Sequence, residues 1–241
     1  MSGSRLRTLS LLTVVVLVGG YALAAFVAPM DADQGFMQKI FYLHVPMAIV
    51  ALCGFVYGGI CAVQHLRTGK PIWDLRSYVA IHIALILGVG VLLTGAIWAK
   101  ASWGHWWVWD EPTLVSFLII FLLYATYTPL RFAIEDRERQ ARYASVFAVT
   151  AGTFVPLNFL AVRAATSLVH PRTFDSANNL PGAMRTAFLV CFAGMVLLFV
   201  TLYQYEILHK QTTARLRALR YRLGGDDGLR PRRSAAPELS V

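Results

Sequence analysis

Charged residues are scarce in this chain: Asp, Glu, Lys and Arg make up only 15% of its 241 residues, whereas hydrophobic residues make up 57%. Ordinary soluble domains carry about 25% charged residues, so this composition argues against one. It is typical of a protein that crosses a membrane several times.

Cysteine and the common catalytic motifs are also scarce. The three cysteines, Cys53, Cys61 and Cys191, lie within apolar stretches and form no Cys-x-x-Cys pair. Thiol chemistry is therefore disfavoured, and without Cys-x-x-Cys-His the chain is not itself a c-type cytochrome. The sequence also contains no phosphate-binding glycine loop, metalloprotease motif or internal repeat, which argues against enzymes built on those motifs.

Long uncharged stretches predict the fold. A helix needs about 20 largely apolar residues to cross the hydrocarbon core, because its backbone groups must bond within the segment. We predict an all-α integral membrane protein, a bundle of six transmembrane helices, in which Pro156 kinks the fifth. The predicted spans are Leu9–Met30, Ile40–Leu66, Ser77–Ala99, Pro112–Leu130, Tyr143–Val162 and Thr186–Tyr205.

The distribution of positive charge predicts the orientation. If both termini are cytoplasmic, 17 of the 22 Lys and Arg residues lie on the cytoplasmic side, as expected for membrane proteins. The loop between the third and fourth helices, which is rich in tryptophan, then faces outward. The five cations on the outer side are Lys39, Lys100, Arg163, Arg172 and Arg185.

The two ends of the chain need separate interpretation. We assign residues 1–209 to the six-helix membrane domain and residues 210–241 to a basic cytoplasmic tail, a helix end followed by a partly disordered segment. The charge of this tail favours anionic lipid headgroups over nucleic acid. A signal peptide is an alternative interpretation of the first span, but its uncharged run is long, so we expect a retained helix.

The stretch "WGHWWVWDEP" concentrates four of the six tryptophans in ten residues. Interfacial tryptophans often form a belt, but a belt is spread around the protein, and this cluster is not. We therefore predict a flat platform for a flat aromatic ligand. If the stretch is helical, at about 100° per residue, one face carries Trp103, Trp106, Trp107 and Asp110, with Trp109 at its edge.

Two histidines are predicted at the same membrane depth as this stretch. His44 lies at the outer end of the second span, with Pro46 in the first helical turn, and His170 precedes Pro171 in the last outward segment. Two imidazoles that approach iron from opposite sides form a bis-histidine haem site. A lone histidine at a helix end more often caps carbonyls or contacts headgroups, so the nearby tryptophans are what favour ligation.

The other four histidines are weaker candidates. His65 and His209 are predicted on the cytoplasmic side, where solvated roles are the simpler interpretation. His82 is an ionisable group within the third span, but no partner histidine is evident at its depth. His105, inside the tryptophan stretch, is an alternative or transient ligand.

Outward cations and acids complete the candidate site. Haem propionates are carboxylates, which pair well with arginine, so Arg172 is the first candidate contact and Lys100 and Lys39 are further ones. Contact with headgroups is the alternative for all three. Asp110 and Glu111 are placed to cap the fourth helix at its N-terminus.

Several short motifs then carry a resemblance to a known family. The residues Trp103, Gly104, Trp107, Trp109 and Asp110 match the Trp-Gly-x-x-Trp-x-Trp-Asp signature of haem-handling membrane proteins. Within that superfamily the chain resembles the CcmC family of haem-delivery proteins in cytochrome c maturation, over essentially all six spans. The further matching motifs, in order, are Ala28-Pro29, Gln34-Gly35, Tyr42–Pro46 and the "LVHP" around His170.

The resemblance implies a function and a set of partners. It implies a multi-pass protein of the bacterial inner membrane that holds b-type, non-covalent haem in transit on the periplasmic face, between His44 and His170 and against the tryptophan platform. It also implies delivery of that haem to the periplasmic chaperone CcmE, with help from the small protein CcmD and the ABC transporter CcmAB. We expect a delivery protein rather than an enzyme, although a lyase-like role in attaching haem to the chaperone stays open.

One position departs from the family pattern. CcmC proteins commonly continue the motif with Ala-Arg-Leu-Thr, whereas this chain has Glu111-Pro112-Thr113-Leu114, which leaves any contact made by that arginine without a counterpart. The proline resembles the Asp-Pro-Lys-Glu of CcsA-type proteins, so a CcsA-like component of another maturation system is one alternative. A b-type cytochrome that retains haem for electron transfer is another, and a small-solute transporter is a third.

Overall fold

The computed structural model describes residues 3–170 and 180–223. Nearly all of these residues are helical, and their only β-type pairing is an isolated bridge between Asp31 and Gly35. The elements are α1 (Gly3–Ala22), η1 (Leu23–Val27), η2 (Phe36–Ile40), α2 (Phe41–Thr68), α3 (Pro71–Trp103), α4 (Pro112–Ala125), α5 (Tyr127–Phe132), α6 (Arg137–Ala164) and α8 (Gly182–Arg222).

Six helical segments of the described chain are long and apolar enough to cross a membrane, which confirms the predicted fold class. They are α1 with η1, η2 with α2, α3, α4 with α5, α6 and α8. Several extend beyond the uncharged stretches, because polar and charged residues continue the helices past the apolar core. α8 runs on to Arg222, and the rest of the basic tail, residues 224–241, lies outside the described residues.

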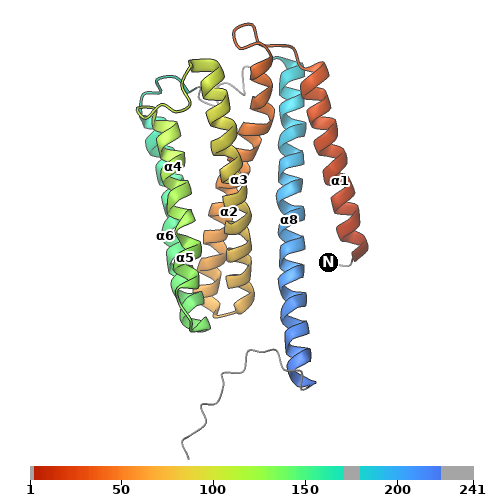
Figure 1. The fold of residues 1–241 in the computed structure, drawn as a ribbon, viewed down its shortest axis with the longest axis vertical. Coiled ribbons are helices and arrows are strands. Elements are labelled where there is room, and N and C mark those ends of the chain that lie inside the picture. The colour runs from red at the N-terminus through yellow and green to blue at the C-terminus, as the bar shows by residue number, and fades with distance from the viewer. Residues whose placement is uncertain (1–2, 171–179, 224–241) are drawn as a thin grey trace, which may run out of the picture.

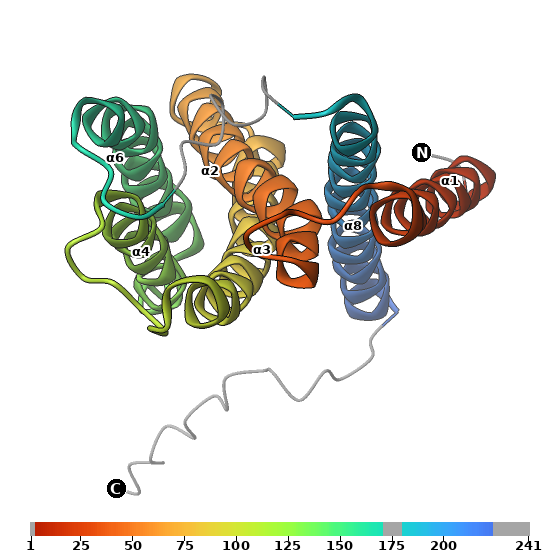
Figure 2. The same ribbon diagram turned by 90° about the horizontal axis from the view of Figure 1, so that it is seen from above.

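The helices pack as a bundle around α2, which contacts α3 and α6 most extensively and also packs on α8 (Figure 1). From above, α1 and α8 lie at one side of the bundle and α4 and α6 at the other, with α2 and α3 between them (Figure 2). α1 contacts mainly α8. The end of the bundle that carries residues 28–40, 104–111 and 165–170 is the upper end in Figure 1.

A largely buried ion pair joins α3 and α5 at the opposite, lower end. The guanidinium of Arg131 donates to both carboxylate oxygens of Asp74, at 2.7 and 2.6 Å. It also donates to the hydroxyl of Tyr127, at 3.2 Å. This bidentate geometry is the kind that compensates for removing two charges from water, so it anchors the end of the bundle remote from the candidate site.

Beyond Trp103 the tryptophan stretch is not helical, so the single helical face considered for it does not form. Gly104 takes a left-handed conformation, with φ of 78°, and its N–H bonds the carbonyl of Lys100 at 3.2 Å. This is a common way for a helix to end, because glycine adopts positive φ without a Cβ clash. α3 therefore stops at Trp103, and the chain runs without regular helix to Pro112, the first residue of α4.

Two prolines that the sequence analysis singled out, Pro46 and Pro156, lie inside helices. The prediction that Pro46 lies in the first turn of its helix is wrong. The helical segment begins further upstream, with η2 and with the start of α2 at Phe41. Pro46 lies inside α2 and is buried. α6 continues through Pro156 to Ala164, so this proline does not end the fifth span.

Candidate functional site

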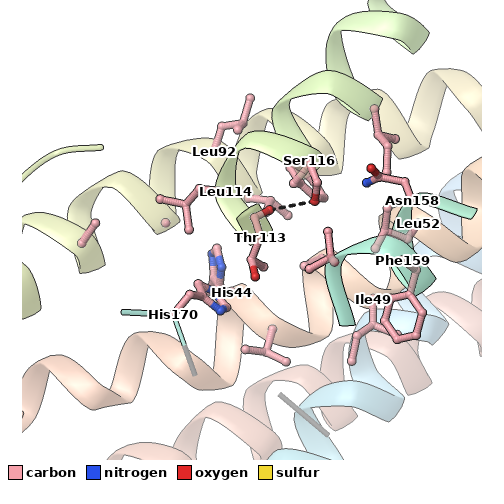
Figure 3. Close-up of a pocket in the computed structure, with 18 of the residues that line it drawn as sticks. His44, Ile49, Leu52, Leu92, Thr113, Leu114, Ser116, Asn158, Phe159 and His170 are labelled. Carbon is pink, nitrogen blue, oxygen red and sulfur yellow. Dashed lines mark hydrogen bonds between the residues drawn. The ribbon is translucent and has the colours of Figure 1, made fainter. Parts of the chain in front are cut away.

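A cavity of about 210 Å³ opens among α2, α3, α4 and α6 at the upper end of the bundle. Its lining brings together His44, His170, Trp103 and Trp107, four residues that sequence analysis selected. Figure 3 shows His44 and His170 at one end of the cavity, with Leu52, Asn158 and Phe159 toward the other. Since His44 and Leu52 lie eight positions apart in α2, the cavity reaches about 12 Å along the bundle.

His44 is held in one orientation by α3. Its Nδ1 lies 2.9 Å from Thr94 Oγ1, and that hydroxyl donates to the Gly90 carbonyl at 2.7 Å. A hydroxyl has one proton, so toward His44 Thr94 acts as an acceptor and Nδ1 carries the imidazole proton. The lone pair is then on Nε2, the form in which a neutral imidazole binds a metal.

Two neighbours restrict the His44 ring further. A Cβ placed on Gly95 would lie 2.9 Å from His44 Cε1, so only glycine at this position leaves room for the ring. Trp98 packs edge-on against it, with ring centroids 5.7 Å apart. The indole of Trp98 donates to Gln34 Oε1 at 2.7 Å, and Ser102 donates to the same oxygen at 3.2 Å. Gln34, which belongs to the Gln34-Gly35 motif, therefore positions Trp98 in the cavity wall and does not itself line the cavity.

His170 reaches the same cavity from the segment that follows α6. Its ring lies 6.2 Å from that of Trp103, in an edge-to-face arrangement. The imidazoles of His170 and His44 are close enough to interact electrostatically. The structure therefore places together two histidines that are 126 positions apart in the sequence.

Glu111 caps α4, as predicted, and also binds the segment before His170. Its carboxylate accepts from the Thr113 amide and from the amides of Leu168, Val169 and His170. Burial acts to raise the pKa of Glu111, but these amide bonds outweigh it, so its pKa lies below the ordinary value and the group is ionised. Asp110, the other predicted cap, is exposed and does not line the cavity.

The four tryptophans of the stretch divide into two pairs. Trp103 and Trp107 line the cavity, whereas Trp106 and Trp109 are 60% and 71% exposed and do not. Trp107 has a buried indole Nε1 that has no hydrogen-bond partner among the described residues. A buried donor without an acceptor is costly, so this N–H is available to an acceptor on a ligand in the cavity.

The outward cations occupy different environments. Lys39 donates to the carbonyls of Ala28 and Pro29, and Lys100 donates to the Gly104 carbonyl at 2.8 Å. Both ammonium groups thus hold loop backbone, and neither residue lines the cavity. Arg172 lies outside the described residues. Arg163, near the end of α6, does line the cavity. Sequence analysis counted it only as an outer charge.

Some of the remaining polar residues line the cavity and others lie outside it. Thr113, Ser116 and Asn158 line the cavity and were not singled out from the sequence, because isolated polar residues at span ends carry no recognisable pattern. His105 is exposed and outside the lining. His82 stacks on Tyr78 in α3, also away from the lining. No group of three or more His, Cys, Asp or Glu suited to a metal ion occurs in the part of the chain described.

Comparison with known proteins identifies the family. The family model described as Heme exporter protein C, CcmC, matches residues 1–222. The chain belongs to the CcmC family. Proteins with the same name match along most of their length. The one from Rhodobacter capsulatus is 30% identical over 224 residues, covering 92% of both chains. That from Paracoccus denitrificans is 32% identical over 210 residues, covering 86% of this chain and 83% of its own.

A third relative matches over a somewhat smaller share of the chain. Heme exporter protein C of Escherichia coli K12 is 30% identical over 194 residues, covering 80% of this chain and 78% of its own. The range matched by the family model, residues 1–222, includes the cavity residues from His44 to His170, and membership of CcmC supports a role in haem handling.

The cavity fits a haem by its own chemistry. It offers two histidines for iron, two indole rings and an apolar wall for the porphyrin, and the unpartnered Nε1–H of Trp107 together with Arg163 for carboxylates.

Proposed function

We propose that this protein binds haem in the upper cavity and delivers it to the periplasmic haem chaperone CcmE during cytochrome c maturation. The observation that carries the proposal is the convergence of His44 and His170 on one cavity that Trp103 and Trp107 also line. Imidazole nitrogens are the usual axial ligands of b-type haem. The matching family description, Heme exporter protein C, supports haem as the cargo.

The orientation follows from charge. Most Lys and Arg residues lie in loops and ends at the lower side of the bundle or in the tail, so we place that side in the cytoplasm. Both termini are then cytoplasmic, and the upper cavity faces the periplasm of the bacterial inner membrane. A site at this end suits release of the cargo to a periplasmic chaperone. CcmD and CcmAB are the further partners that we expect.

Each part of the cavity has a role in this proposal. Nε2 of His44 binds the iron from one side, because Thr94 leaves the proton on Nδ1, and His170 binds from the other. Trp103 and Trp107 contact the porphyrin face or edge, while Arg163 and the indole N–H of Trp107 bind propionate. The exposed residues Gly104, Trp106, Trp109 and Asp110 lie outside the cavity lining and make no contact with the haem in this proposal. The chain acts as a delivery protein rather than an enzyme.

Absorption spectra of the detergent-purified protein test this function. The parent from haem-replete cells should show a Soret band and a six-coordinate, low-spin spectrum, and His44→Ala and His170→Ala should each lose the low-spin form. The matched control is His209→Ala, an exposed histidine at the lower part of α8, which should keep the parent spectrum. A parent without haem, or ligand variants with unchanged spectra, would contradict the assignment.

Transfer distinguishes this protein from a cytochrome. Mixing the haem-loaded protein with apo-CcmE should move haem to the chaperone in a covalent form. Retention of all the haem would favour a b-type cytochrome, and transfer in a system that lacks CcmE would favour a CcsA-like role.

A further inference from the structure

Glu111 is the most completely buried carboxylate of the described chain, with none of its surface exposed. Its Oε2 accepts from three consecutive backbone amides, those of Leu168 and Val169 at 2.9 Å and that of His170 at 3.2 Å. Its Oε1 accepts from the Thr113 amide at 3.4 Å and the Ser167 hydroxyl at 3.5 Å. One side chain thus joins the start of α4 to the segment that carries His170.

These bonds fix the backbone of residues 165–170, which has no helix or strand to stabilise it. α6 ends at Ala164, and residues 165–170 form no helix or strand. Three successive N–H groups that point at one anionic oxygen constrain the peptide planes between them, in the manner of backbone anion nests. Hydrogen bonds to an ionised acceptor are also about twice as strong as neutral ones. With the backbone of Leu168–His170 constrained, the direction in which His170 leaves the chain is constrained as well.

The bonds account for a buried charge that would otherwise be unfavourable. An ionised carboxylate that leaves water must find hydrogen-bond donors or a cation. At Glu111 the donors come from the backbone of the His170 segment itself, so carboxylate and segment each satisfy the other. The cavity shows the result: His170 and His44 line the same cavity, at the same end of it in Figure 3.

We propose that Glu111 is the positioning residue for His170, holding the imidazole where it can bind the haem iron opposite His44. The inference rests on the proposed haem site. It gives a role to the position at which this chain departs from the usual family continuation of the motif. Because Glu111 lies within the tryptophan stretch, two residues after Trp109, one carboxylate connects the aromatic part of the site with its second ligand.

Amide hydrogen exchange in the haem-free protein tests the positioning directly. Glu111→Met keeps the length of the side chain and removes both carboxylate oxygens, leaving only a weakly accepting sulfur. We expect at least tenfold faster exchange in a peptide that covers residues 165–170. The matched control is Asp136→Ala, which removes another helix-capping carboxylate, the acceptor for the Arg139 amide at 2.8 Å at the lower end of α6. It should leave the 165–170 peptide unchanged. Equal protection in Glu111→Met and the parent would overturn the proposal.

The haem-loaded protein supplies a second, spectroscopic readout. Glu111→Met should retain haem through His44 but change from low-spin to high-spin ferric haem, and added imidazole should restore the low-spin spectrum, as it should in His170→Ala. An unchanged low-spin spectrum would overturn the positioning role while leaving the haem site intact. If the parent itself lacks a bis-histidine spectrum, the proposed function fails, and only the exchange result bears on Glu111.

A milder substitution covers the case in which Glu111→Met does not fold. Glu111→Gln keeps one neutral acceptor oxygen, so exchange of the 165–170 peptide should lie between the parent and a full loss. Folding is judged by a single symmetrical peak on size exclusion in detergent. Parent-like exchange in a folded Glu111→Gln protein would contradict the proposal, because the charge-assisted bonds would then be without effect.

Discussion

Thr94 Oγ1 lies 2.9 Å from Nδ1 of His44 while it donates its own proton to the Gly90 carbonyl. The pair leaves Nε2 as the acceptor of a buried histidine that lines the cavity. Removal of the hydrogen-bond partner of a metal-binding histidine typically costs about 10 to 100-fold in affinity. The predictions below use this and similar contacts to test the site residue by residue.

Thr94→Val should weaken haem retention by about tenfold or more, because His44 loses the acceptor that fixes its tautomer and orientation. The measurement is the rate and extent of haem loss to an excess of apomyoglobin. Thr153→Val on α6 removes a similar hydroxyl that bonds the Val149 carbonyl on an exposed face and should behave like the parent. Equal retention in both variants would show that the Thr94 contact has no part in binding.

Gly95→Ala should lower the haem content by about tenfold, because the new Cβ would lie 2.9 Å from His44 Cε1 and displace the ring. Alanine favours a helix over glycine by about 0.5–1 kcal/mol, so a lower haem content would not follow from a weaker helix. Gly19→Ala on α1, where no atom lies within 4 Å of the new Cβ, is the control. The checks are the ratio of Soret to protein absorbance and the thermal unfolding midpoint; normal haem content in Gly95→Ala would contradict the packing argument.

Arg163→Gln should reduce affinity for haem by about 10 to 100-fold, the equivalent of one hydrogen bond to a charged group at about 1.5–3 kcal/mol. The sharper comparison uses haem dimethyl ester, in which both propionates are neutral. The parent should bind the ester more weakly than haem, and Arg163→Gln should distinguish the two much less. Arg185→Gln, an exposed cation of α8 outside the cavity lining, should keep the parent's preference.

The two pairs of tryptophans should differ in effect. Trp103→Leu and Trp107→Leu should each weaken haem binding, because these rings line the cavity, whereas Trp106→Leu and Trp109→Leu should leave haem content within about twofold of the parent. Titration of the haem-free protein with haemin measures the difference. An equal loss in all four variants would favour a continuous platform over the division seen in the structure.

Much of this architecture could be predicted from the sequence. Uncharged stretches of about 20 residues are sufficient to identify membrane helices, because the bilayer requires internal backbone bonding, and all six spans are present. His44 and His170 could also be selected from the sequence, because imidazole is a ligand for haem iron and both residues were predicted near the outer ends of spans. Their motif neighbours further indicated the family.

The absence of a helix beyond Trp103 in the tryptophan stretch has a specific cause. Its helical spacing was regular, but Gly104 adopts positive φ and ends α3 at Trp103. A glycine near a helix end is compatible with either outcome in a sequence. The choice depends on whether the C-terminal carbonyls find partners, and here the Lys100 carbonyl bonds the Gly104 amide.

The sequence by itself thus determined the class of protein, its spans and the residue types available for haem, because these depend on composition and local periodicity. Only the tertiary structure decided which of those residues share a cavity. Thr94 reads as an ordinary threonine of an apolar helix, Arg163 as one of several outer charges, and Glu111 as a helix cap. Their contacts with His44, with the cavity and with the His170 segment join residues that are far apart in the sequence, and such long-range contacts leave no local pattern in the chain.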